Sequence, residues 1–385
     1  MHIAQRSPRT AFHSTMPLKC LRDSEELFAF NITSDDEWSG LRAENAETRC
    51  LRMACCQSTV ALRTSRLGTR HFAHSRRGEC TTAPESVEHL LAKSTVVSGV
   101  ARTSWTAKVE QGGTTPHADA WVADVLATQT GKKSVAFEIQ WSLQTEEETR
   151  VRQARYRAAG IRGLWLFRQY DFTTNKEIPA FRLRLDDESK AFQVLIPSPL
   201  YSPRLVSAKT DEHYLWQQAI ELSRFAEGAL TGRLRFAAAL NQTMPLEIRA
   251  APTVCWNCHK NIRIVTRLSF AAGKILPGCS DVPCSIYDFD KIPEGPDLLA
   301  RLVPRALLAN HDIGELKLRY SNTVNSRYLS NGCIHCGALS GRFFDHELGA
   351  DSVAFKVAAT LDAAWATKLP SAERHINCWW FDNSF

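Results

Sequence analysis

Two acidic residues, Asp124 and Glu138, each interrupt a segment that otherwise reads as a β-strand. The segment SVAFEIQWS at 134–142 alternates large apolar side chains with small or polar ones, which predicts a half-buried strand. The segment WVADVLA at 121–127 has the same character. A polar stretch with the turn glycine Gly131 separates them, so we expect a hairpin.

This hairpin would bring the two carboxylates together. Asp124 and Glu138 each lie seven residues from Gly131, so a turn there places them opposite each other. Opposed residues of an antiparallel pair share a face, with Cβ atoms about 4.5–5.5 Å apart. Like charges at that separation repel unless a cation lies between them, and carboxylate oxygens suit Mg²⁺ or Mn²⁺. We therefore predict a divalent-metal site, with solvated surface carboxylates as the alternative.

Cysteines form the second chemical pattern. The chain has 12 of them, including two CxxC knuckles at 255–258 and 333–336 of the kind found in zinc ribbons. Four thiolates close a tetrahedral structural Zn²⁺ site. The predicted zinc ligands are Cys255, Cys258, Cys333 and Cys336. A competing set replaces the second knuckle with Cys279 and Cys284, but CxxC turns present two sulfurs to one ion more readily than Cys-x4-Cys does.

A weaker cluster lies nearer the N-terminus. Cys55, Cys56 and Cys80 flank the segment RHFAH, whose two histidines add imidazole ligands. We keep a second metal site open for one set of these residues: Cys56, Cys80, His71 and His74.

The elements around the hairpin set the expected fold. A proline-acidic opening and paired leucines predict that a helix starts in the segment 84–93 and carries Glu88. A strand near 105–109 precedes the hairpin, a charged helical pattern covers 145–159, and the apolar run at 163–167 predicts a further strand. The expected order is α-β-β-β-α-β.

This order, with an acidic residue on the first helix, Asp on one central strand and Glu-x-Gln on the next, resembles the PD-(D/E)XK nuclease superfamily. The chain more closely resembles the competence protein CoiA-like family, over residues 16–170 above all. The shared features are GTRHFAH at 68–74, Cys80, ESVEHLLAK at 85–93, ADV at 123–125, FEIQWS at 137–142, Arg152, Tyr156, Gly160 and Trp165. Many family members carry the first cysteine of an N-terminal knuckle where this chain has Met53.

The resemblance implies an α/β, restriction-endonuclease-like core with a cysteine-rich N-terminal segment and a C-terminal zinc-ribbon region. It matches Asp124 and Glu138 to the metal-binding carboxylates and Glu88 to the acidic residue of the first helix. Gln140 stands where many of these nucleases carry lysine. A neutral amide cannot supply positive charge or act as a base near neutral pH, but it can orient an attacking water. Candidate substrate contacts lie on the next helix: Arg152, Gln153 and Tyr156.

These residues also have ordinary structural interpretations. Acidic residues such as Glu88 are common partners of a helix N-terminus. Arg152 and Glu148 have the i, i+4 spacing of a surface ion pair. Tyr156 is suited to a helix-to-sheet core contact, and we expect His89 to pack or to lie at the surface.

Composition is that of a soluble globular protein, with 44% hydrophobic and 23% charged residues in 385. No long apolar run or signal peptide is evident, so we expect a cytoplasmic protein without a membrane partner. The formal charge of +6 permits a polyanionic partner. Basic residues crowd one early segment: Arg63, Arg66, Arg70, Arg76 and Arg77.

The prolines at 197–203 predict a linker. The expected organisation is a leader at 1–15 with Met16 as the candidate start, an N-terminal Cys/His subdomain at 16–80, a nuclease-like core at 81–200 and a helical and zinc-ribbon region at 201–385. In that last region we expect helices over 211–230 and 351–367.

The resemblance favours a metal-dependent nuclease that acts on single- or double-stranded DNA in uptake, recombination or processing, with Mg²⁺ or Mn²⁺ at its site and structural Zn²⁺ elsewhere. The alternative is a non-catalytic DNA-binding or recombination-assisting protein on the same scaffold. A zinc-organised protein adaptor, with no affinity for DNA, is a third interpretation.

Overall fold

The computed structural model describes residues 18–75, 86–186, 188–204, 213–276, 279–341, 350–369 and 376–384. The expected leader and Cys80 lie outside these ranges. The chain divides into two compact units, residues 1–197 with 201–234 and residues 198–200 with 235–385. Within the described ranges, no helix combines the length and the apolarity needed to cross a bilayer.

The first unit begins with small sheets around one helix. Ser34 caps that helix by accepting hydrogen bonds from two backbone N–H groups of its first turn, and Trp38 packs on Phe72 with ring centroids 5.7 Å apart. One sheet has the order β2-β1-β3, and β4 pairs with β5. The elements are β1 (Lys19–Arg22), β2 (Glu25–Phe28), a short 3₁₀ helix (Ala29–Asn31), α1 (Asp35–Thr48), β3 (Leu51–Arg52), β4 (Val60–Thr64) and β5 (Arg70–His74).

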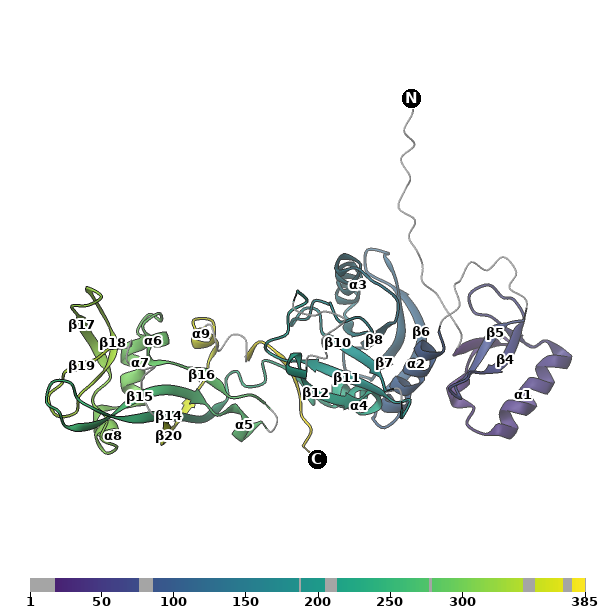
Figure 1. The fold of residues 1–385 in the computed structure, drawn as a ribbon. Coiled ribbons are helices and arrows are strands. Elements are labelled where there is room, and N and C mark those ends of the chain that lie inside the picture. The colour runs from purple at the N-terminus through teal and green to yellow at the C-terminus, as the bar shows by residue number, and fades with distance from the viewer. Residues whose placement is uncertain are drawn as a thin grey trace, which may run out of the picture. The chain divides into compact units, whose positions relative to one another are not determined.

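A seven-stranded mixed sheet of order β12-β11-β10-β9-β8-β7-β6 dominates the rest of this unit (Figure 1). The fold is α/β, as the sequence predicts, and its central sheet is mixed. Strands β8–β9 and β9–β10 pair in parallel, and the other neighbours are antiparallel. The strands are β6 (Thr106–Thr114), β7 (Ala120–Thr128), β8 (Val135–Gln140), β9 (Arg162–Phe167), β10 (Ala180–Leu185), β11 (Phe192–Pro197) and β12 (Trp216–Glu221).

Helices α2 (Val87–Val100) and α4 (Leu222–Thr231) cover one face of this sheet, and α3 (Glu146–Ala158) covers the other. The alternation along β10 shows this, because Ala180 joins the cluster of Tyr156 on α3, whereas the next residue, Phe181, packs on Phe225 of α4 at 5.0 Å. Helix α2 approaches α4 closely at Gly99, where an added Cβ would lie 2.2 Å from the Ser223 carbonyl oxygen. Along the chain the order is α2, β6, β7, β8, α3, β9.

The segment 211–230, expected to be one helix, is instead a 3₁₀ turn (His213–Leu215), strand β12 and helix α4. The strand forms because Trp216–Glu221 pairs with β11 at the edge of the sheet.

The second unit is built on a sheet of order β16-β15-β14-β20 with its own apolar core. Its strands are β13 (Leu234–Phe236), β14 (Thr243–Val254), β15 (Asn261–Phe270), β16 (Val282–Cys284), β17 (Lys317–Ser321), β18 (Ser326–Gly332), β19 (Leu339–Ser340), β20 (Ser352–Thr360) and β21 (Trp379–Phe381). Its helices are α5 (Ala272–Ile275), α6 (Ile286–Phe289), α7 (Gly295–Leu302), α8 (Arg305–Ala309) and α9 (Ala363–Ala366).

The prediction of a helix over 351–367 was wrong. Most of that segment is strand β20, which pairs with β14 from Thr243 to Ala250. The alanines favour a helix locally, but pairing with a long neighbouring strand overrides that preference.

Candidate active site and metal centres

The hairpin expected around Gly131 is formed by β7 and β8. Their register pairs Val125 with Phe137 and Ala127 with Val135. Asp124 and Glu138 are the next residues beyond the first of these pairs, so the main chain places them as neighbours across the hairpin.

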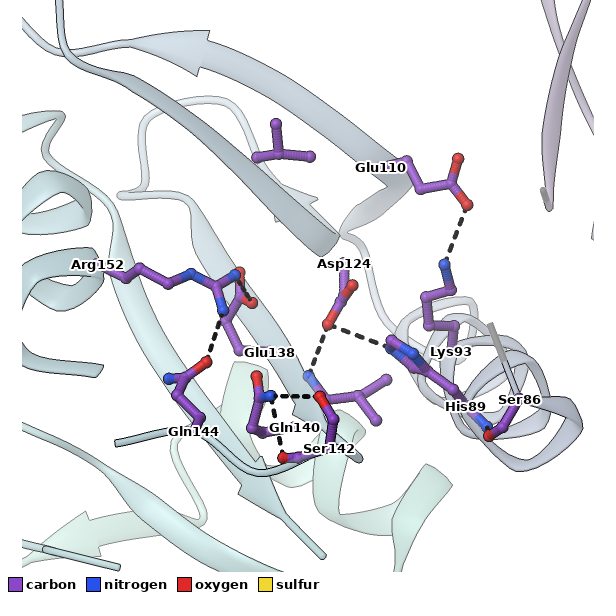
Figure 2. A network of polar contacts seen from close by, with 12 residues as sticks. Ser86, His89, Lys93, Glu110, Asp124, Glu138, Gln140, Ser142, Gln144 and Arg152 are labelled. Carbon is purple, nitrogen blue, oxygen red and sulfur yellow. Dashed lines mark hydrogen bonds and ion pairs between the residues drawn. The ribbon is translucent and has the colours of Figure 1, made fainter. Parts of the chain in front are cut away.

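Their side chains nevertheless turn to different helices (Figure 2). Asp124 Oδ2 accepts the Ile139 N–H at 2.8 Å and lies 3.4 Å from His89 Nε2 on α2. Glu138 instead contacts Arg152 and Tyr156 on α3, which covers the opposite face. The structure therefore does not direct the two carboxylates to one shared face.

A break in the alternation of β7 explains this. The β6–β7 register pairs Val109 with Val125 and Gln111 with Ala123, and Glu110, between the first members of these pairs, has a left-handed φ of 51°. Ala123 packs in the α3-side cluster. Leu126 packs in the same cluster, so regular alternation from Leu126 would turn Asp124 toward α3, whereas its carboxylate lies beside His89 on α2.

Helix α2 supplies two basic groups to the surroundings of Asp124. Ser86 caps α2 by accepting the His89 N–H, which fixes His89 in the first turn, and Lys93 follows one turn later. Burial disfavours the charged form of Asp124, but His89 and Lys93 outweigh it and hold the pKa of its carboxyl well below the usual range. Asp124 is thus an ionised carboxylate whose side chain stays 22% exposed.

Lys93 also forms an ion pair that the sequence did not lead us to expect. Its side chain is fully buried, and its Nζ lies 3.0 Å from Oε1 of the buried Glu110. A buried ammonium is very costly unless it is paired and hydrogen-bonded. The signals in the sequence were the i, i+4 spacing of His89 and Lys93 and an acidic residue inside β6.

Glu138 is completely buried and both of its oxygens are engaged. Oε1 accepts the Tyr156 hydroxyl, and Oε2 pairs with Arg152. Arg152 also donates to Gln144 at 3.1 Å and stacks over Trp165, 5.0 Å from the ring centroid. Burial raises the pKa of Glu138 to about 7 even though Arg152 opposes that change.

The other predicted residues lie near this centre in different ways. The Gln140 amide donates to the Ser142 carbonyl and hydroxyl, each at 3.2 Å. Gln153 is tied into the core, because it accepts the Trp165 N–H at 2.7 Å and donates to a backbone carbonyl at 2.9 Å. Glu88 pairs with Arg66. In the described part of the chain it makes no hydrogen bond or ion pair with Asp124, Glu138 or Gln140.

The alternative surface pair of Arg152 with Glu148 is not what the structure shows. Glu148 closes a capping box with Thr145 at the start of α3. Arg152 points instead to the buried Glu138.

Asp124 and Glu138 carry the oxygen ligands that a divalent cation prefers, but their side chains do not converge on one point. Asp124 offers an ionised hard oxygen. Across the ranges that the structure covers, however, no three His, Cys, Asp or Glu side chains that include Asp124 or Glu138 bring their ligand atoms within 4.8 Å of one another. To bind a metal ion, Glu138 would have to release its ion pair with Arg152.

Residues 85–214 match the family described as competence protein CoiA, nuclease-like domain. The chain carries a CoiA nuclease-like domain. Neither the search of curated proteins nor the search of solved structures returned a significant match. The CoiA nuclease-like domain contains the whole α2-to-α3 network, whereas both cysteine clusters lie outside the matched residues.

C-terminal to the CoiA nuclease-like domain, the two CxxC knuckles meet in the second unit. The Sγ atoms of Cys255 and Cys336, and those of Cys258 and Cys333, are 3.6 Å apart, too far for disulfides. Hydrogen bonds from the Asn257 side chain and from the backbone lower the pKa of the Cys336 thiol to about 6. This arrangement can hold a structural metal such as zinc.

The two knuckles have the same internal geometry. His259 and Gly337 each follow their knuckle in left-handed conformation and donate to the carbonyl of its first cysteine, at 2.9 Å. The competing ligands Cys279 and Cys284 do not join this group. Cys284 is buried in the apolar core of the unit, where it lies on β16.

The N-terminal cluster forms with different members from those expected. Cys55, Cys56 and His74 bring their ligand atoms together, and the shortest contact is 3.2 Å from Cys56 Sγ to His74 Nε2. His71 is not among them, because its Nδ1 lies 3.2 Å from the Thr69 carbonyl oxygen and its ring is buried. The expected ligand Cys80 falls outside the described residues.

Proposed function

We propose that this CoiA nuclease-like domain has a PD-(D/E)XK core and hydrolyses DNA phosphodiester bonds with a divalent metal, in DNA uptake, recombination or processing. The observation that carries the proposal is the ionised, partly exposed Asp124 beside Glu138 across the β7–β8 hairpin of a nuclease-like domain.

In this proposal Asp124 and Glu138 hold Mg²⁺ or Mn²⁺, and Glu88 on α2 completes the shell directly or through water. A bound divalent ion would polarise the phosphoryl oxygens and make a nucleophile of water near neutral pH. Gln140, close to the end of β8, orients the attacking water through its amide.

Nearby cations supply the positive charge that Gln140 lacks. Lys93 lies close enough to Asp124 to stabilise its charge, and Arg152 is held against Glu138. When Glu138 takes part in binding the metal, the guanidinium of Arg152 becomes available to a phosphate, for which its planar fork is suited. Tyr156 and Gln153 are the other candidate substrate contacts on α3, and the two core hydrogen bonds of Gln153 favour a structural role for it.

One observation favours the non-catalytic alternative, a DNA-binding or recombination-assisting protein on a nuclease scaffold. Each carboxylate of the site already has a basic neighbour, since Arg152 pairs with Glu138, Lys93 pairs with Glu110 and His89 lies 3.4 Å from Asp124. Carboxylates that are already engaged by basic groups attract a divalent cation less strongly than free ones do.

The deciding experiment is cleavage of labelled linear and circular DNA, single- and double-stranded, with Mg²⁺, Mn²⁺ or EDTA. The variants are Asp124→Asn and Glu138→Gln, and the matched control is Glu177→Gln, a surface acid paired with Arg157. We expect metal-dependent cutting that both site variants abolish and the control retains. DNA binding without cutting by any of the four proteins would refute catalysis and support the scaffold function.

The second part of the proposal is that the paired knuckles hold one structural Zn²⁺. The single observation behind it is the convergence of four thiol sulfurs from two separate hairpins.

A further inference from the structure

The first knuckle holds a tryptophan that is hydrogen-bonded at its indole N–H but largely exposed to solvent. Trp256 lies between the two ligands Cys255 and Cys258, and its side chain is 69% exposed. Its indole N–H donates to the Leu339 carbonyl on β19, next to the second knuckle, at 2.9 Å. One edge of the ring is therefore anchored while the ring itself remains largely in water.

Tryptophan is normally well buried, because a large apolar surface left in water is unfavourable. Within the ranges that the structure covers, no aromatic ring or guanidinium stacks on Trp256. A ring that is both anchored and open has little rotational freedom to lose when a flat ligand stacks on it.

The surroundings indicate which ligand fits. Apart from the cysteine thiols, the charged side chains in the knuckle segments 250–263 and 331–341 are both basic, and these are Lys260 and Arg263. Asn257, Lys260 and Asn261 are exposed around the tryptophan in the sequence. Neither segment carries a carboxylate, although the exposed Asp312 lines one hollow together with Asn261 and Arg263. Lys260 is therefore the cation best suited to a phosphate, and the amides of Asn257 and Asn261 can bond to bases.

We infer that Trp256 is a stacking platform for an unpaired base of single-stranded nucleic acid, with Lys260 at the adjoining phosphate. Bases in a duplex are already stacked, so the platform distinguishes single strands from duplexes. This extends the proposed function, since it gives the second unit a site for the same class of polymer, but it requires no cleavage.

A weak dependence of binding on salt is a further signature of this site. Four thiolates around one Zn²⁺ leave a formal charge of about −2, which Lys260 and Arg263 offset. Stacking must then supply most of the affinity, so the contribution of Trp256 should change little with ionic strength.

The test is fluorescence anisotropy with labelled single-stranded and duplex oligonucleotides, on zinc-loaded full-length protein without Mg²⁺. Loss of one stacked base weakens binding by roughly 5- to 150-fold. We expect a loss in this range for Trp256→Ala on single strands, a smaller loss for Trp256→Phe, and none for Tyr214→Ala, which removes another exposed aromatic side chain. Zinc content shows whether each variant is folded at the knuckles.

Unchanged single-strand binding by zinc-loaded Trp256→Ala would overturn the inference, and so would failure of the wild type to bind single strands. If Trp256→Ala does not retain zinc, Lys260→Glu replaces it, and unchanged binding by that variant also refutes the site. Binding of a proline-rich peptide in place of the oligonucleotide would assign the platform to a protein partner. Failure of the nuclease proposal looks different, because DNA is then bound through Trp256 but never cut.

Discussion

The buried ion pair of Lys93 with Glu110 makes a sharp quantitative prediction. Replacing Lys93 with Met removes the ammonium but keeps most of the side-chain volume in its buried site. Glu110, only 8% exposed, then loses the ammonium that lies 3.0 Å from its carboxylate, and Asp124 loses a nearby positive charge. Breaking a buried pair by removing one partner costs about 3–5 kcal/mol, a large part of the 5–15 kcal/mol that stabilises a typical domain.

The double variant Lys93→Met, Glu110→Gln tests the physical reason. With both charges gone, most of the desolvation penalty disappears, so the double variant should be more stable than Lys93→Met alone. The control is Lys190→Met, an exposed lysine, which should change stability by less than about 0.5 kcal/mol.

The assay is urea unfolding, with the transition of the first unit followed separately because the protein has two compact units. A loss below about 1 kcal/mol for Lys93→Met would refute a charged, paired lysine at this position. A double variant as unstable as the sum of the two single variants would refute the coupling between the charges.

Three further predictions use other parts of the molecule. Burial raises the pKa of Glu138 from 4.5 to about 7, so the folded state binds its proton more tightly than the unfolded chain. The resulting contribution of about 3 kcal/mol is present below pH 4.5 and is lost as pH rises through 7, and Glu138→Gln should flatten that part of a stability-against-pH curve. Cys258→Ser should lower the zinc content by one ion per chain and destabilise the second unit, whereas equal loss with Cys279→Ser would favour the competing ligand set. Gly99→Ala should cost about 1–3 kcal/mol because its Cβ would meet the Ser223 carbonyl, whereas Gly40→Ala, an open helix position, should stabilise by about 0.5–1 kcal/mol, as thermal unfolding can measure.

Local patterns were sufficient for part of the site. The turn at Gly131 and the period of two fix the β7–β8 register, so the main-chain neighbourhood of Asp124 and Glu138 follows from the sequence. The pairing of the two knuckles follows equally from ligand geometry, although 74 residues separate Cys258 from Cys333. The family resemblance also rests on residues in order along the chain, and the match at 85–214 confirms it.

The tertiary structure decided which way those residues face and what pairs with them. Glu110, in the strand next to Asp124, has a left-handed φ. No sequence pattern around Asp124 predicts that its side chain turns toward α2. The partners Lys93 and Arg152 come from helices on opposite faces of the sheet, so only helix packing brings them to their carboxylates. Alternation and spacing describe a chain within one element, whereas the charge balance of a buried site depends on contacts between elements.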